Sequence, residues 1–213
     1  MPKFYVYKMV CDNGGAPCVY PQNSANAVLS LSICKPMIRS SACKGDWLFG
    51  FGGKKLGGRL IYIAEVDEVL KGGEYYRNPK YMIRPDCIYQ KEGVNYSWKK
   101  GSDFHKNGSN IDHDLGKFPE RKRAIALLIN NFRYFGEENT LNWQEKYDHL
   151  KTMLDDLKQG HRVNHSTEVE SDLNKLKDAI WRQYPDEKQL GLPTNREKCG
   201  KSSTRSSKCN CGS

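Results

Sequence analysis

Apolar and polar positions alternate along much of residues 1–66, a pattern that predicts short, half-buried β-strands. The predicted strands are residues 3–10, 27–34, 47–51 and 59–66. A Gly57-Gly58 pair precedes the last of these runs, so the last two are expected to pair as a hairpin. Short strands joined by glycine-rich turns are typical of a small barrel or a curled sheet.

The rest of the chain divides into an irregular segment and a helical one. Residues 71–116 are polar but contain several tyrosines, and a long segment of this kind inside a domain is usually functional. Residues 123–129 are apolar and fit either a buried strand or the start of a helix. Residues 142–158 and 166–184 place apolar side chains at helical spacing, which predicts two helices.

These elements predict one α+β domain at residues 1–193. Its β-rich part, residues 3–136, is expected to form a curled or barrel-like, mostly antiparallel sheet, on which the helical part, residues 142–184, packs. Residues 194–213 are expected to be a disordered basic tail, because they contain almost no apolar side chains.

Charge points to an anionic partner. The 34 basic and 25 acidic residues give a formal charge of +9, which favours a nucleotide or nucleic acid. No apolar run reaches the roughly 20 residues of a membrane span, and the N-terminus lacks a signal-peptide pattern. We therefore expect no membrane partner and a cytoplasmic location.

The eight cysteines do not have the spacing of a disulfide framework or a zinc site. Cys11, Cys18, Cys34, Cys43 and Cys87 fall among the predicted strands, where cysteine packs as a small hydrophobe. The tail cysteines, Cys199, Cys209 and Cys211, could offer three thiolates to zinc but include no CxxC pair. We predict no metal site, and no motif identifies a cofactor.

A first candidate site lies around the turn that follows the second predicted strand. Lys35 and Arg39 could hold a phosphate, while Trp47 could stack on a base. The alternative is that Trp47 belongs to the core and the two cations are solvated.

Histidines define two further candidates. The candidates are His105, and Asp112 within the run Asp112-His113-Asp114. A histidine near carboxylates is suited to general acid–base catalysis because its pKa lies near neutrality. His161, with Arg162 and Asn164, could form an acid/base and phosphate site beside Gly160. The alternative for the first group is ordinary loop hydrogen bonds. For the second, Arg162 would pair with a carboxylate and His161 would cap the preceding helix.

Several motifs together resemble a known family. The chain has Cys34-Lys35-Pro36-x-Ile38-Arg39, then Gly45-Asp46-Trp47-Leu48-x-Gly50, and later Asn131-Phe132-x-Tyr134-Phe135-Gly136 and Gly160-His161-Arg162-x-Asn164. In this order they are similar to the second family of nucleotide-modification-associated domains, over about residues 3–185. The resemblance implies a link to DNA modification in phages and bacteria, or to phage defence. At the level of fold, the pattern is also similar to PUA-like domains.

Two classes of function fit these observations. The first is an enzyme acting on a nucleotide or base, with His105 or His161 as acid/base. The second is a non-catalytic reader of a modified base or nucleic acid, or a scaffold subunit of a modification system. The sequence contains no P-loop, GxGxxG or established catalytic motif that would decide between them.

Overall fold

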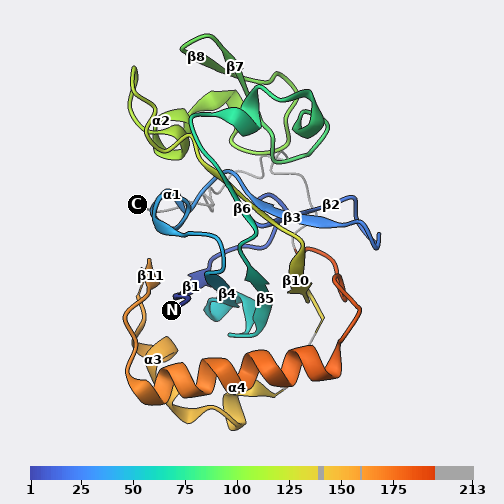
Figure 1. Cartoon of the computed structure of the whole chain (residues 1–213), viewed down its shortest axis with the longest axis vertical. Helices are drawn as coiled ribbons and strands as arrows, with labels where there is room; N and C mark the ends of the chain where they lie inside the picture. The colour runs from blue at the N-terminus through green and yellow to red at the C-terminus, as the bar shows by residue number, and fades with distance from the viewer. Residues whose placement is uncertain (139–141, 159, 195–213) are drawn as a thin grey trace.

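The computed structural model describes residues 1–138, 142–158 and 160–194, and Figure 1 shows its arrangement. In chain order the elements are β1 (Phe4–Met9), β2 (Cys18–Tyr20), β3 (Val28–Leu31), α1 (Pro36–Ser41), β4 (Trp47–Gly52), η1 (Lys54–Leu56), β5 (Leu60–Glu65), β6 (Glu68–Leu70), η2 (Glu74–Tyr76), η3 (Pro79–Tyr81), β7 (Tyr89–Glu92), β8 (Asn95–Trp98), η4 (Lys106–Gly108), α2 (Ile111–Leu115), β9 (Ala126–Ile129), β10 (Asn131–Tyr134), η5 (Trp143–Glu145), α3 (Asp148–Asp156), β11 (His161–Arg162) and α4 (Thr167–Gln183).

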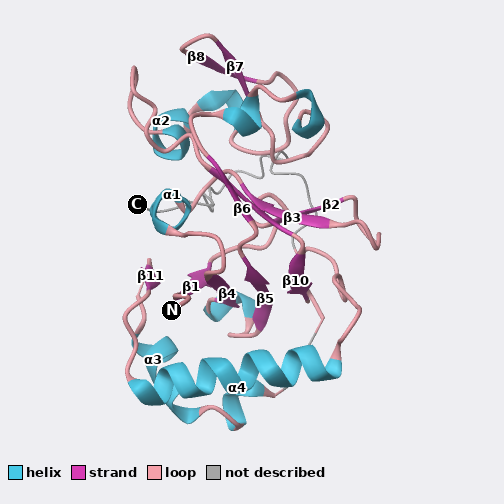
Figure 2. Ribbon diagram, in the orientation of Figure 1, coloured by secondary structure: helices cyan, strands magenta, loops and turns pink. Residues whose placement is uncertain are grey.

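A five-stranded sheet of order β10-β5-β4-β1-β11 lies at the centre of the molecule. Strands β1 and β4 are parallel, and the other neighbours are antiparallel. Helices α3 and α4 cover one face of this sheet (Figure 2). Because side chains alternate along a strand, Val6 packs toward the helices while Tyr5 and Tyr7 point to the opposite face.

A second sheet of four strands, in the order β2-β3-β9-β6, packs against that opposite face. Apolar side chains from both sheets, such as Leu29 and Leu48, form a common core between them. The far side of the second sheet meets the segment from Lys71 to Arg123, which we call the upper segment because it lies at the top of Figure 1. The chain therefore stacks as helices, first sheet, second sheet and upper segment.

A buried polar network fixes the upper segment to the second sheet. The carboxylate of Asp86 accepts hydrogen bonds from the hydroxyls of Ser30 and Ser32 on and beside β3, at 2.6 and 2.7 Å. Its other oxygen accepts from the Tyr75 hydroxyl at 2.7 Å, and the Arg84 guanidinium lies 3.6 Å away. Asp86 is fully buried and Arg84 nearly so, which makes this network an internal anchor.

The structure confirms several predictions from the sequence. The chain is α+β, its strand pairing is mostly antiparallel, and β4 and β5 form the predicted antiparallel pair. Residues 126–129 are a strand, which settles the alternative left open there. Residues 142–158 form the turn η5 and the shorter helix α3, because Tyr147 interrupts the helix with a non-helical backbone conformation (φ −132°, ψ 73°). Helix α4 nearly fills its predicted range.

The prediction of a barrel was wrong. The described strands form separate open sheets instead, because the chain leaves the first sheet after β1 and builds the second sheet from β2 and β3. The PUA-like resemblance stays a prediction, as does the division into a domain and a tail. The tail from residue 195, with its three cysteines, lies outside the described residues. Across the ranges described, no helix has both the length and the apolar character to cross a membrane.

Candidate active site

Cys34 lies at the sharp turn between strand β3 and helix α1. Its side chain is buried, at 5% exposure. Both Cys34 and Lys35 have positive φ angles, 54° and 41°, a conformation that residues other than glycine rarely adopt. Such strain costs on the order of 1–3 kcal/mol per residue and persists where the surrounding structure enforces it. The turn is therefore held in place by other contacts.

A histidine and a carboxylate line up behind the thiol. The Sγ atom of Cys34 lies 3.3 Å from Nε2 of His105, and Nδ1 of His105 lies 2.6 Å from Oδ2 of Asp114. The backbone N–H of Cys34 donates to the other carboxylate oxygen of Asp114, at 2.7 Å. Cysteine, histidine and aspartate thus form a closed set of contacts, joining β3, the loop before η4, and α2.

The protonation state of this set follows from its partners. Burial alone would raise the pKa of Asp114, but the hydrogen bond and charge of His105, the charge of Arg39 and the Tyr89 hydroxyl together lower it below the ordinary value. An ionised carboxylate can only accept hydrogen bonds, so Nδ1 of His105 carries the proton. Nε2 is then the ring nitrogen that can take the thiol proton of Cys34.

Arg39 supports the backbone of both Cys34 and Asp114. Its guanidinium is fully buried and donates to the backbone carbonyls of Cys34 at 2.7 Å and Asp114 at 2.6 Å. It also donates to the carbonyls of Arg123, at 2.9 Å, and Ile125. These bonds connect the strained turn to α2. The guanidinium of Arg39 therefore supports the backbone of the site and is not exposed to a phosphate.

The three side chains are better suited to proton transfer than to metal binding. Their ligand atoms do lie within 4.8 Å of one another, as a metal site requires. However, Cys34 and Asp114 contact opposite nitrogens of the His105 ring, and the 2.6 Å contact at Nδ1 leaves no room for an ion. The order of contacts is that of a nucleophile, its base and the group that orients the base.

Aromatic and basic side chains lie close together where the first sheet meets the turn that carries Lys35. The hydroxyls of Tyr7 and Tyr62 are 2.6 Å apart, and the Nζ atom of Lys35 lies 5.0 Å from the centre of the Tyr7 ring. His161 on β11 stacks on Tyr5 with ring centres 5.9 Å apart. Burial lowers the pKa of His161, and the charge of the nearby Lys35 lowers it further.

Of the eight residues predicted as sites, His105 contacts the Cys34 thiol, Arg39 donates to its carbonyl, Lys35 follows it in the chain and His161 lies near Lys35, while the other four lie elsewhere. Trp47 packs edge-on against Trp181 of α4, with ring centres 5.0 Å apart, on the helix side of the first sheet. Arg162 is exposed and pairs with Val6, so strand alternation turns it away from the face that His161 occupies. The remaining two lie on the surface: Asn164 is exposed, and Asp112 pairs with Arg121.

The sequence reasoning missed the contacts of Cys34 with His105 and Asp114 and undervalued Asp114. Cys34 was expected to pack as a small hydrophobe, although it begins the Cys-Lys-Pro motif. Asp112 was preferred to Asp114, yet α2 exposes the first and buries the second. A helix of one turn at residues 111–115 would have given this distinction, because its buried face includes Asp114 and Leu115.

One family profile matches this chain. The family described as nucleotide modification associated domain 2 matches residues 1–198, and the chain belongs to it. This confirms the resemblance found from the sequence motifs. No curated protein and no solved structure matches the chain. The family name indicates a role in nucleotide modification and specifies no reaction.

Proposed function

We propose that the protein is an enzyme that uses Cys34 as a nucleophile toward a nucleotide or a nucleotide-derived base. The observation that carries this proposal is the line of contacts from Cys34 Sγ through the His105 ring to Asp114. The family membership supplies the substrate class, because its name concerns nucleotide modification. A role in a DNA modification or phage-defence system, in the cytoplasm, agrees with that context.

The chemistry that this arrangement supports best is acyl transfer. His105 Nε2 takes the thiol proton, and the thiolate of Cys34 attacks a carbonyl carbon, forming a C–S bond as the carbonyl electrons move to oxygen. When the carbonyl re-forms, the amine or alcohol leaving group takes the proton from His105 and a thioester remains. Water or an amine then attacks this thioester, with His105 again as base, and the thiol of Cys34 is regenerated.

Other groups in the site suit this sequence of steps. Asp114 orients the His105 ring and stabilises its protonated form, as a buried carboxylate does in other nucleophile–histidine pairs. The Tyr7 hydroxyl contacts that of Tyr62 at 2.6 Å, and burial, Tyr62 and then the charge of Cys34 raise the pKa of Tyr7. This hydroxyl is a suitable donor for a developing oxyanion.

The alternative function as a non-catalytic reader finds less support. Its predicted stacking platform, Trp47, is half-buried against Trp181 and lies on the opposite face of the first sheet from the thiol. A reader also has no use for a strained cysteine held against a histidine–aspartate pair. The arrangement around Cys34 is explained more simply by covalent catalysis.

The reactivity of Cys34 provides the first test. An ordinary thiol with a pKa of about 8.5 is less than about 1% ionised at pH 6, whereas a thiol activated by histidine is largely thiolate. We expect iodoacetamide at pH 6 to alkylate Cys34 at least about tenfold faster than Cys43, an exposed cysteine of the same chain. His105→Ala should remove this excess, and Asp114→Asn should reduce it. Mass spectrometry of the labelled peptides measures both rates.

The second test concerns the products. Nucleosides and nucleotides from cells that express the wild type should differ from those of cells that express Cys34→Ser. His105→Ala should give the same profile as Cys34→Ser. If Cys34 reacts no faster than Cys43 and the two profiles are identical, the protein is not a cysteine-dependent enzyme.

A further inference from the structure

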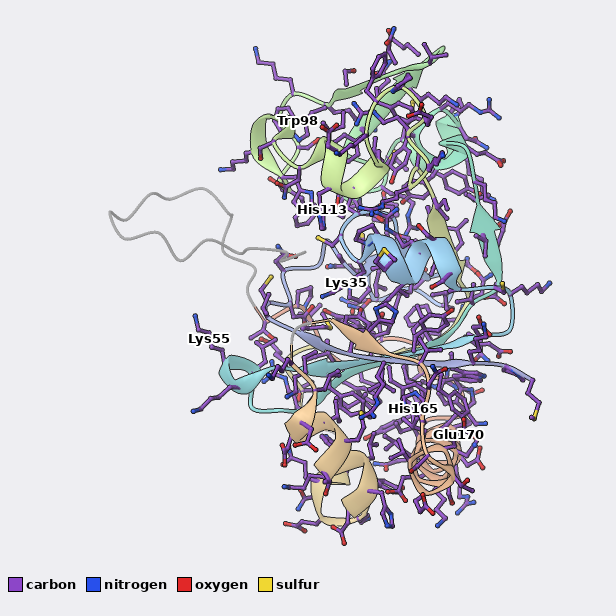
Figure 3. All side chains as sticks on the ribbon, turned by 90° about the vertical axis from the view of Figure 1, so that its left-hand side faces the viewer. Lys35, Lys55, Trp98, His113, His165 and Glu170 are labelled. Carbon is purple, nitrogen blue, oxygen red and sulfur yellow. The ribbon has the colours of Figure 1, made fainter. Side chains whose placement is uncertain are left out.

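Lys35 is a charged group beside the nucleophile whose role in the site is not yet assigned. It follows Cys34 directly in the chain, is half-buried, and forms no ion pair with a carboxylate in the part of the chain that the structure describes. Figure 3 shows it beside α1, between the upper segment, which carries His113 and Trp98, and the lower part that carries His165. A partly desolvated cation without an acidic partner is costly unless a ligand supplies the negative charge.

The neighbours of Lys35 complete a site for an anion. His161 lies close enough for the lysine charge to lower its pKa, and its ring nitrogens offer hydrogen bonds to a ligand oxygen. The rings of Tyr5 and Tyr7 form the wall: Lys35 lies over Tyr7, and His161 stacks on Tyr5. Residues Tyr7 and His161 are direct partners in the pairing of β1 with β11, so a sheet fixes this arrangement.

We infer that Lys35 and His161 form a subsite that binds the phosphate of a nucleoside monophosphate whose reactive carbon lies at Cys34. This inference rests on the proposed function and specifies its substrate as a free nucleotide. One half-buried lysine and one histidine match a single terminal phosphate. A nucleic-acid strand, by contrast, is usually held by many exposed cations along its backbone.

Direct binding tests this subsite independently of catalysis. The binding of the four common 2′-deoxynucleoside 5′-monophosphates is measured by isothermal titration calorimetry. At least one of them should bind more tightly than its nucleoside and than inorganic phosphate. Lys35→Gln should weaken that binding about fivefold or more, while Lys35→Arg should largely retain it. Lys55→Gln is the matched control, because Lys55 is exposed on η1 and lies far from Lys35 in Figure 3.

The charge at the thiol can be measured with two small reagents. Iodoacetate is an anion and iodoacetamide is neutral, so the ratio of their rates at Cys34 reports the local potential. Lys35→Gln should lower this ratio about three- to tenfold, as expected for the loss of a nearby unit charge in a partly solvated site. The same ratio at Cys43 should not change.

The outcomes separate the two proposals. If no monophosphate binds, or if Lys35→Gln changes neither binding nor the reagent ratio, the subsite is refuted, even where Cys34 remains highly reactive. If a single-stranded oligonucleotide binds and monophosphates do not, the substrate is a nucleic acid and the inference is wrong. If Lys35-dependent binding is found while Cys34 is unreactive, the subsite stands and the enzyme proposal fails.

Discussion

Replacing Arg39 with alanine should strongly destabilise the protein. The guanidinium donates to the backbone carbonyls of Cys34, Asp114, Arg123 and Ile125, and it is fully buried. Each buried carbonyl left without a donor costs roughly 1–3 kcal/mol, although water entering the cavity would satisfy some of them. Removing the buried charge returns part of the loss, so we expect a net decrease of about 3–5 kcal/mol in the free energy of unfolding.

Urea denaturation followed by tryptophan fluorescence measures this loss. With a slope of about 2 kcal/mol per molar urea, the midpoint should fall by roughly 1.5–2.5 M. Arg39→Lys should give an intermediate loss, because one ammonium cannot reach carbonyls on several sides. Arg162→Ala, which removes an exposed arginine, should cost about 0.5 kcal/mol or less. A loss below about 1 kcal/mol for Arg39→Ala would refute the reasoning.

Two further predictions concern buried carboxylates. Asp86→Ala leaves the Arg84 guanidinium buried without its counter-charge and should cost about 3–5 kcal/mol in urea unfolding. Asp12 has a pKa raised above its ordinary value, chiefly by burial, so the folded state keeps this proton to higher pH than the unfolded state. Its contribution to stability is therefore complete below about pH 4 and is lost as pH rises through the folded pKa. Asp12→Asn cannot ionise, so its stability relative to wild type should increase from about pH 4 upward and then level off.

Each of these predictions has a control. Asp112→Ala removes an exposed carboxylate paired with Arg121 and should cost at most about 1 kcal/mol, against the larger loss at Asp86. Equal losses at Asp86 and Asp112 would show that the buried network is not an anchor. For Asp12, a stability difference that stays constant between about pH 4 and 8 would contradict the raised pKa.

Local patterns predicted the longer strands and helices but missed the short strands β2, β6, β7, β8, β10 and β11 and the short helices α1 and α2. Alternation and short apolar runs located β1, β3, β4 and β5 within a few residues, since each of these strands has at least one face in a core. The helix α4 was predicted well because Ser166 caps it and its apolar stripe is regular. The barrel was a wrong inference because sheet closure depends on which edges meet, and no local pattern encodes that.

The site depended on contacts between residues distant in the sequence. Cys34 and His105 are 71 positions apart, and Cys34 and Asp114 are 80 apart. Sequence reasoning selected His105 for its titration near neutral pH but had no means of pairing it with a thiol. It expected Arg39 to hold a phosphate or to be solvated, because charged side chains are seldom fully buried and the four acceptor carbonyls come from three separate segments.

The placement of Cys34 and His105 in different layers has a consequence for when the protein is reactive. The thiol follows a strand of the second sheet, while its base and the orienting carboxylate belong to the upper segment. His105 and Asp114 lie far from Cys34 in the sequence, so a chain in which the upper segment has not yet docked lacks the histidine contact at this thiol. Under the proposed mechanism, activation of Cys34 by His105 therefore requires the completed fold.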